Sequence, residues 1–257
     1  VSGWTFTSSI TQLDTNRIQH TLVYTHTATH LEARCVAIEY TDYPAVEWTL
    51  YFKNNGTANS SILTNIQALN TNLSSSVSGN FTLRYSDGST KIQTDFQPRQ
   101  ATLGTTAFSL TPSNGFSSAG VLPFFNLVNP DGSGTVIGVG WSGQWKTTFT
   151  RLSGTSANAK AGMETETLYL LPTEQIRTPA ILLDFWSGGD YLTGQNQLRS
   201  LLLNHYSPTQ NGAPVNPPIA AQSNASYGYS NITQANQITG IDNIALHTLP
   251  VDYWCID

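Results

Sequence analysis

Short runs of alternating polar and apolar residues extend from Trp4 to about Leu183 and constrain the fold most strongly. In Leu31–Tyr40 (LEARCVAIEY), every second side chain lies on the same face of an extended backbone. Val46–Phe52 repeats the pattern, and Asn129–Gly134 (NPDGSG) is a strong turn signal. Because no long helical pattern interrupts this region, we expect a mostly β fold, a large β-sandwich.

The remaining strands are expected on the same grounds, between turn residues. The residues that follow the turn at Asn129–Gly134 are expected to form a β-hairpin from Thr135–Trp145 and Lys146–Leu152. The other expected strands are Ile18–His30, Ser61–Leu69, Asn80–Tyr85, Phe124–Leu127, Leu168–Leu171 and Ile181–Phe185.

The pattern changes after Trp186. Gln195–Tyr206 has helical spacing, and Thr233 is a candidate N-cap for a second helix of about fourteen residues. Pro250 ends that helix, and Leu249–Asp257 (LPVDYWCID) reads as a buried strand. The expected inward residues are Leu198, Leu201, Leu202 and His205 in the first helix, and Ile238, Ile241, Ile244 and Ala245 in the second. We expect a sandwich at 1–187, a helical linker and loop at 188–232, and a helix and strand at 233–257.

The composition limits the partners. Charged residues make up 11% of the chain, the net charge is -5, and no cluster of Lys or Arg is present. Nucleic acid and membranes are therefore not expected partners. No apolar run reaches the roughly 18 residues that cross a bilayer. The uncharged polar surface and the Val at position 1 favour a processed, secreted protein.

Two cysteines, Cys35 and Cys255, both lie in strand-like runs. Two buried free thiols are the first interpretation, and a long-range disulfide is the alternative. Glycosylation is an open question, because six N-x-S/T sequons are about what chance gives in a chain rich in Asn, Ser and Thr. Four of them fall within Asn55–Thr82, which suggests that this region is exposed.

Residues that carry chemistry are few. His20, His26 and His30 share a strand face, but no carboxylate or thiol completes a metal site. Glu164 and Glu166 share a strand face and are interpreted as solvated acids rather than as a glycosidase pair. No phosphate or dinucleotide motif occurs, so no cofactor or metal is expected.

Tryptophan offers a more specific candidate. Trp141 and Trp145 flank Ser142-Gly143-Gln144. Indole rings stack on the apolar faces of sugars while an amide such as Gln144 binds the hydroxyl groups. A sugar-stacking platform is one interpretation, and burial of both rings in the core or in an interface is the other.

Several segments resemble the N-terminal domain of glycoside hydrolase family 36 (GH36) α-galactosidases, in the same order along the chain. Among the longest are Asp42–Asn54 (DYPAVEWTLYFKN), Leu122–Leu127 (LPFFNL) and Val136–Trp145 (VIGVGWSGQW). The others are Ile62–Leu69, Gly162–Glu164, Glu174–Pro179, Leu198–Pro208 and Pro250–Asp257.

The resemblance implies a β-supersandwich packed against a catalytic (β/α)₈ barrel, of which 233–257 would be the first helix and strand. It implies retaining enzymes that release terminal α-galactose, with catalytic aspartates on later barrel strands. Neither of those positions exists in this chain, so it is expected to be inactive alone. The resemblance also implies that Asp257 contacts the sugar, beside Trp254, and that copies assemble into a symmetric oligomer.

Two functions follow as hypotheses. The first is the non-catalytic N-terminal part of a secreted α-galactosidase-like glycoside hydrolase, whose partners would be a galactose-type sugar and the catalytic barrel. The second is a stand-alone galactose-binding lectin derived from that domain. The native polypeptide's length and a titration with galactosides would distinguish them.

Overall fold

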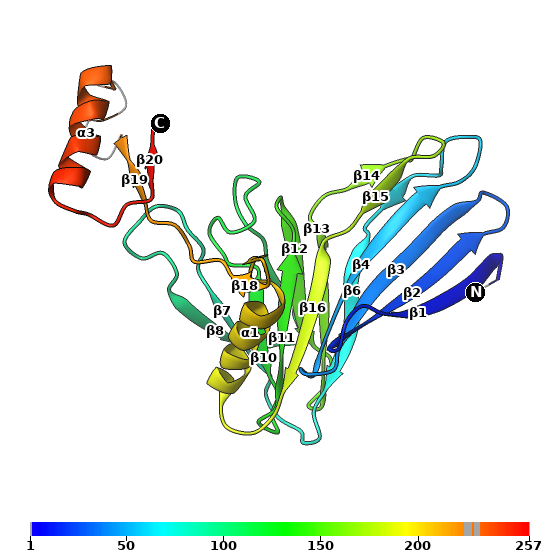
Figure 1. Cartoon of the computed structure of the whole chain (residues 1–257). Coiled ribbons are helices and arrows are strands. Elements are labelled where there is room, and N and C mark those ends of the chain that lie inside the picture. The colour runs from blue at the N-terminus through cyan, green and yellow to red at the C-terminus, as the bar shows by residue number, and fades with distance from the viewer. Residues whose placement is uncertain (1, 224–227, 229–231, 257) are drawn as a thin grey trace. The chain divides into compact units, whose positions relative to one another are not determined.

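The computed structural model describes residues 2–223, 228 and 232–256 of the chain. The chain divides into two compact units, Val1–Leu202 and Leu203–Asp257. The first unit is built almost entirely of β-strands (Figure 1).

Ten antiparallel strands form the larger sheet of the first unit. They are β1 (Trp4–Gln12), β2 (Arg17–His26), β3 (Leu31–Tyr40), β4 (Ala45–Asn54), β7 (Thr82–Ser86), β8 (Pro98–Thr102), β10 (Phe124–Val128), β11 (Gly134–Gly140), β15 (Gln175–Arg177) and β16 (Ala180–Trp186). Their order is β1–β2–β3–β4–β16–β11–β10–β7–β8, and β15 also pairs with β4. Strands β1 and β8 are therefore the two edges of this sheet.

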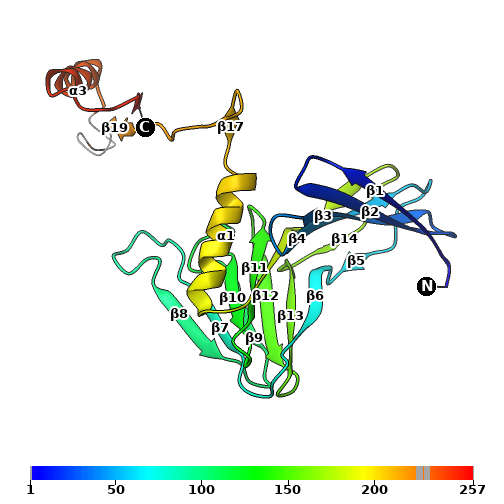
Figure 2. The ribbon, with the colours of Figure 1, turned by 60° about the horizontal axis from the view of Figure 1, so that its bottom comes forward.

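A smaller antiparallel sheet forms the second layer of the sandwich. Its order is β6–β13–β12–β9, and it consists of β6 (Gln67–Ser74), β9 (Phe108–Leu110), β12 (Trp145–Arg151) and β13 (Ser156–Met163). A two-stranded ribbon of β5 (Leu63–Thr64) and β14 (Thr167–Leu168) belongs to the same unit. Figure 2 shows this layer, turned by 60° from the view of Figure 1.

The hydrophobic core lies between the two sheets and follows from the alternation. Along β12, Trp145, Thr147 and Phe149 are buried, while the residues between them face outward. Phe125 and Ile137 from the larger sheet are also fully buried in this core. Removing this apolar surface from water, at about 25 cal/mol per Å², is what holds the sheets together. The prediction of a mostly β fold with a β-sandwich is confirmed.

Helix α1 (Tyr191–His205) covers the opposite face of the larger sheet. The predicted stripe is confirmed for three leucines: Leu201 is fully buried, and Leu198 and Leu202 pack beside it. Their partners on the sheet side are Tyr40, Ala45 and Leu182. The helix begins four residues before the predicted start, and the first unit continues to Leu202, beyond the boundary expected after residue 187.

The expected hairpin of Thr135–Trp145 with Lys146–Leu152 is wrong. Strand β11 pairs with β10 and β16, whereas β12 pairs with β13 and β9. The chain thus crosses from one sheet to the other between Gly140 and Trp145. Both strands point alternate residues into the same core, so the sequence pattern is the same for a hairpin and for a crossing. Strand β13 went unrecognised because its inward residues are small: Ala157, Ala159 and Ala161.

In the second unit, β17 (Thr209–Gln210) and β18 (Ala213–Pro214) pair with each other. β19 (Ala220–Gln222), helix α3 (Gln234–Leu246) and β20 (Tyr253–Cys255) follow in the chain. β19 and β20 pair in parallel, which makes a strand–helix–strand unit in which β19 had not been predicted. The predicted N-cap is confirmed, since the Thr233 hydroxyl accepts from the N–H of Asn236.

Trp254 of β20 packs on α3. A Cβ on Gly240 would lie 2.7 Å from the indole ring, so only glycine permits this approach. The indole Nε1 donates to Oε1 of Gln237 at 2.8 Å. The buried positions of α3 are therefore Gln237 and Gly240, and the expectation that Ile238 and Ile241 point inward is wrong, because both are about half exposed.

The exposure of side chains tests the expectations for the two cysteines and for the sequon asparagines. Cys35 and Cys255 are both free thiols; Cys35 is half-buried and Cys255 is exposed, so only their unpaired state matches the first interpretation. Asn55, Asn59, Asn72 and Asn80 are exposed, as expected for that part of the chain. Among the described residues, no helix has the length and apolar character to span a membrane.

Candidate functional site

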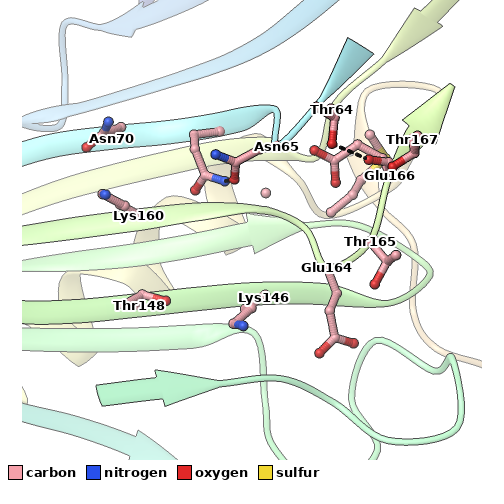
Figure 3. A pocket seen from close by; sticks show the side chains of 13 residues that line it. Thr64, Asn65, Asn70, Lys146, Thr148, Lys160, Glu164, Thr165, Glu166 and Thr167 are labelled. Carbon is pink, nitrogen blue, oxygen red and sulfur yellow. Dashed lines mark hydrogen bonds between the residues drawn. The ribbon is translucent and has the colours of Figure 1, made fainter. Parts of the chain in front are cut away.

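A polar pocket of about 500 Å³ lies on the outer face of the smaller sheet, within the first unit (Figure 3). Its floor is made by outward-facing residues of three neighbouring strands. Thr148 of β12 lies opposite Lys160 of β13, and Lys160 lies opposite Asn70 of β6. These residues face outward because the alternate positions of the same strands carry the core side chains.

A second row of the floor brings Lys146 opposite Gly162. A Cβ at Gly162 would lie 2.4 Å from the carbonyl oxygen of Ile66, so glycine allows β6 to approach closely here. The register between β6 and β13 shifts at this point, as in a β-bulge. The pocket lies beside this irregularity, and its lining includes Lys146, Gly162 and residues of β5 and β14.

That ribbon forms one wall of the pocket. The carboxylate of Glu166 accepts from the backbone N–H of Ile66, and Thr64 Oγ1 donates to the carbonyl of Glu166 at 3.1 Å. Asn65 lies between them, with φ at 53°. This wall is tied to the floor by backbone and side-chain bonds, so the pocket is preformed rather than assembled on binding.

The two carboxylates of the pocket do not form a catalytic pair. Glu164 accepts from Gln144 Nε2 at 2.7 Å, whereas Glu166 accepts from the N–H of Ile66. Their side chains point in different directions (Figure 3). Hydrolysis with retention requires two carboxyl groups facing the same bond about 5–5.5 Å apart. Glu164 and Glu166 lie in the bend between β13 and β14, and both are half-buried and hydrogen-bonded, so the expectation of two solvated acids on one strand face is wrong.

The pocket presents ammonium, amide and hydroxyl groups to solvent. Lys146 and Lys160 take part in none of the ion pairs formed among the described residues. Its lining includes no aromatic ring. Such a surface can hydrogen-bond a hydroxyl-rich molecule, but it offers no stacking face. The sequence did not single out Lys146, Lys160 or Asn70, because outward polar residues mark any solvated sheet face equally.

The expected sugar-stacking platform of Trp141, Gln144 and Trp145 is not present. Trp145 is fully buried, its Nε1 donates to the carbonyl of Ser117 at 2.9 Å, and the ring of Phe125 lies 5.6 Å away. The assignment of Trp145 as a sugar-binding residue is therefore wrong, because the alternation of β12 turns its ring into the core.

Trp141 and Gln144, the other two residues of the expected platform, make contacts with other parts of the chain. Trp141 is half-buried against the core, with the guanidinium of Arg177 5.1 Å from its ring centre. Gln144 Oε1 accepts from the N–H of Gly115, and its Nε2 donates to Glu164 and to the carbonyl of Pro112. Gln144 therefore ties a loop to the pocket wall and has little capacity left for a sugar.

The last two expected site residues belong to the second unit. Trp254 is half-buried on α3, and its indole N–H is already bound to Gln237. Asp257 lies outside the described residues, so its expected contact with a sugar stays a prediction.

Groups that could hold a metal do not converge in the described part of the chain. His20 Nε2 is 2.9 Å from Glu39 Oε2, and His26 Nδ1 is 2.9 Å from the Thr29 hydroxyl. These histidines serve separate local contacts on the sheet.

One buried acid stands apart from the pocket. Asp184 of β16 lies beneath α1, where Gln197 Nε2 donates to its Oδ1 while Oδ2 has no hydrogen-bond partner. Burial raises the pKa of Asp184 to about 6, and the bond from Gln197 opposes that shift. Because α1 covers this carboxyl, it acts in the packing of the helix rather than on a ligand.

No family model matches the chain, and no curated protein matches its sequence. The fold, in contrast, matches solved structures. The α-galactosidase from Lactobacillus brevis superposes with a TM-score of 0.75 at 15% identity, over 99% of this chain and 35% of that one. A GH36 α-galactosidase from Geobacillus stearothermophilus gives 0.74 at 14% identity, over 99% and 36%.

The galactosidase domain of an α-galactosidase–sucrose kinase also gives a TM-score of 0.74 at 14% identity, over 98% of this chain and 36% of that one. The chain thus spans about a third of the length of these structures. The resemblance stated from the sequence is confirmed at the level of the fold: this chain has the fold of the N-terminal domain of GH36 α-galactosidases.

Proposed function

We propose that this chain is the non-catalytic N-terminal β-sandwich portion of a secreted α-galactosidase-like glycoside hydrolase. The observation that carries the proposal is the fold match, which takes in nearly all of this chain and about a third of each enzyme. The carboxylates of the candidate pocket lack the geometry of a glycosidase pair, which is consistent with a supporting rather than a catalytic part.

The second unit supports the same proposal. A strand, a helix and a parallel strand form the repeating element of a (β/α)₈ barrel. Parallel sheets are normally covered on both faces, yet β19 and β20 form a sheet of only two strands among the described residues. The large apolar side chains exposed on this unit are Leu203, Tyr206, Val215, Ile219, Ile238, Ile241, Leu246, Leu249, Tyr253 and Ile256. We take the body of a catalytic barrel to be the partner that covers this surface.

An activity assay tests the proposal. The pure 257-residue chain is expected to release no p-nitrophenol from p-nitrophenyl α-galactoside, because the catalytic aspartates of such enzymes lie on barrel strands outside it. An intact GH36 α-galactosidase serves as the positive control. Turnover by this chain alone, at a rate that scales with its concentration, would refute the proposal. The intact mass of the native protein, expected to exceed that of 257 residues, separates it from the alternative.

The alternative is a stand-alone galactose-binding lectin, and the preformed polar pocket is the observation that favours it. Under this reading the sugar would be held by Lys160 and Asn70 through hydrogen bonds. In the enzyme reading, Asp257 and Trp254 are the proposed sugar contacts, and Trp141 remains a candidate as a half-exposed ring.

Titration of pocket variants with a galactoside distinguishes the lectin from the enzyme hypothesis. In the lectin reading, Lys160→Ala and Asn70→Ala each weaken galactoside binding about tenfold, the loss of one hydrogen bond to a charged or amide group. Thr150→Ala is the matched control, since Thr150 faces outward on β12 but does not line the pocket. Absence of calorimetric heat at millimolar galactoside would count against the lectin.

A further inference from the structure

A second pocket, of about 680 Å³, lies in the first unit beside β6 and the end of β16. Its volume falls within the range of about 300–1,000 Å³ that is usual for small-molecule sites. Four segments contribute to the lining: Thr71–Ser74 of β6, the turn between β10 and β11, Phe185–Ser187 at the end of β16, and Gln197 of α1. The pocket thus joins residues of both sheets and of the helix.

No ionisable side chain lines this second pocket in the described part of the chain. Amides, hydroxyl groups and an aromatic ring make up most of its surface. The pocket on the smaller sheet, in contrast, contains two lysines and two glutamates. A phosphate, a carboxylate or a cation would lose its hydration in the second pocket without gaining an opposite charge. The lining therefore favours a neutral ligand.

Hydrogen bonds fix the walls of the second pocket before any ligand binds. The Asp131 carboxylate accepts from the N–H and the hydroxyl of Ser76 at 2.7 and 2.9 Å, and from the hydroxyl of Ser133 at 2.6 Å. Ser76 follows β6 of the smaller sheet, whereas Asp131 and Ser133 lie in the turn between β10 and β11 of the larger sheet. Because one carboxylate joins the two sheets here, binding costs little ordering entropy.

A buried amide in the same turn has an unused acceptor. Asn129 is 9% exposed and lines the pocket, and its Oδ1 has no hydrogen-bond partner among the described residues. Its Nδ2 donates to Ser133 Oγ at 2.9 Å. Because the Ser133 hydroxyl gives its own proton to Asp131, it can only accept from Asn129, which fixes the orientation of the amide. A ligand hydroxyl can supply the donor that this buried oxygen lacks.

Two further amides of the lining keep one polar group free. Gln197 Nε2 donates to Asp184 Oδ1 and, at 2.7 Å, to the carbonyl of Phe185, and no described group donates to its Oε1. The Oδ1 of Asn72 accepts from Asn158 Nδ2 at 2.8 Å, which leaves the Asn72 amide N–H groups as donors. The pocket therefore offers both acceptors and donors, as a molecule with several hydroxyl groups requires.

Phe185 adds an apolar face to these polar groups. It is 40% exposed, although Leu183, two residues earlier on the same strand face, belongs to the core. Its N–H donates to the carbonyl of Pro44 at 2.9 Å and its carbonyl accepts from Gln197, so the backbone that carries the ring is held on both sides. An aromatic ring beside amides suits a sugar, whose C–H face packs on the ring while its hydroxyl groups bond to the amides.

We propose that the second pocket binds a neutral saccharide of about two sugar rings. One ring packs on Phe185, and the hydroxyl groups donate to Asn129 Oδ1 and Gln197 Oε1 and accept from Asn72. The site shares no residue with the pocket on the smaller sheet. The inference goes beyond both functions proposed above and does not depend on which of them is right.

Titration of the isotope-labelled 257-residue chain with maltose, cellobiose and lactose tests the site by nuclear magnetic resonance. At least one of these disaccharides is expected to shift the side-chain amide signals of Asn129 and Gln197, with saturation below about 20 mM. Phe185→Leu keeps the apolar bulk but removes the aromatic face, so it is expected to weaken binding about fivefold. Phe185→Tyr keeps the ring and the affinity. Phe124→Leu is the matched control, since Phe124 is also 40% exposed, on β10 of the same sheet, but lines neither pocket.

The outcomes separate this site from the lectin hypothesis. Lys160→Ala is expected to leave the disaccharide affinity unchanged, and a response that Lys160→Ala abolishes while Phe185→Leu preserves it overturns the inference. The absence of any shift with all of the sugars at about 20 mM also overturns it. The affinity is expected to be the same at about 0.05 and 0.5 M sodium chloride, because no charged group lines the pocket, and a steep fall with salt would contradict the assignment. Release of p-nitrophenol by the chain would refute the proposed function and leave this site standing.

Discussion

Trp145→Ala is expected to lower the free energy of unfolding by about 3–5 kcal/mol, the usual cost of truncating a large core aromatic. Trp145 is fully buried, its ring contacts that of Phe125 edge-on, and its indole N–H bonds to the carbonyl of Ser117. Its loss leaves a cavity and a buried carbonyl without its donor. A shift of the midpoint in a urea or guanidinium titration measures the effect.

Trp141→Ala is the matched control, four residues earlier in the same chain segment. Trp141 is half-buried, and its main polar contact is the guanidinium of Arg177. A partly exposed ring of this kind contributes about 1 kcal/mol. Equal losses for both tryptophans would contradict the assignment of Trp145 to the core and Trp141 to its margin.

Asp184 is expected to make the sandwich less stable as the pH rises. The pKa of Asp184 is raised from 3.8 to about 6 in the folded chain by burial under α1. Below about pH 4 the carboxyl is protonated in both the folded and unfolded chain, and its contribution is fully present. Between pH 4 and 6 only the unfolded chain loses the proton, so stability falls. Above pH 6 the loss is complete, at about 3 kcal/mol.

Asp184→Asn isolates this effect. The amide oxygen can still accept from Gln197, but the side chain no longer titrates. The stability of the variant relative to wild type is expected to increase from pH 4 to 6 and then stay constant. The measurement is the unfolding free energy of both proteins by denaturant titration at several pH values. A difference that does not change with pH would refute the buried-charge assignment.

Asp131→Asn provides a comparison of opposite sign. The hydroxyl and N–H groups of Ser133 and Ser76 donate to Asp131 and hold its pKa well below its usual value. Such a carboxylate stabilises the fold above the unfolded pKa and loses that contribution as the pH falls. Asp131→Asn is therefore expected to lower the free energy of unfolding at neutral pH, and to lower it by a smaller amount in acid.

Much of the fold could be predicted from local pattern. Strand β3 spans Leu31–Tyr40 as expected, and the leucine stripe of α1 packs on the sheet as its spacing indicated. In these elements the apolar spacing of the sequence matches the buried face. A shift of one residue would turn the apolar side chains towards solvent, so the pattern allows only one placement. Prediction failed where two arrangements share one pattern, as at the crossing from β11 to β12, and where the inward residues were only alanine, as in β13.

The candidate site was less accessible to prediction. The exposed tryptophan pair was inferred from residue type, but the phase of β12 decides that Trp145 points inward. The pocket residues come from three strands that pair over long separations, Lys160 with Asn70 and Thr148 with Lys160. A polar residue on a strand looks the same in sequence whether or not a hollow lies beside it.

The class of fold and the N-cap of α3 could be inferred from the sequence alone, because alternation, turn chemistry and capping act over a few residues. It also carried the resemblance to the GH36 domain through short ordered motifs. The folded chain was needed to show which strands share a sheet, which tryptophan is buried, and that β1 lies at an edge of the larger sheet. These depend on pairing between distant segments, whose free energy comes from contacts that no local window contains.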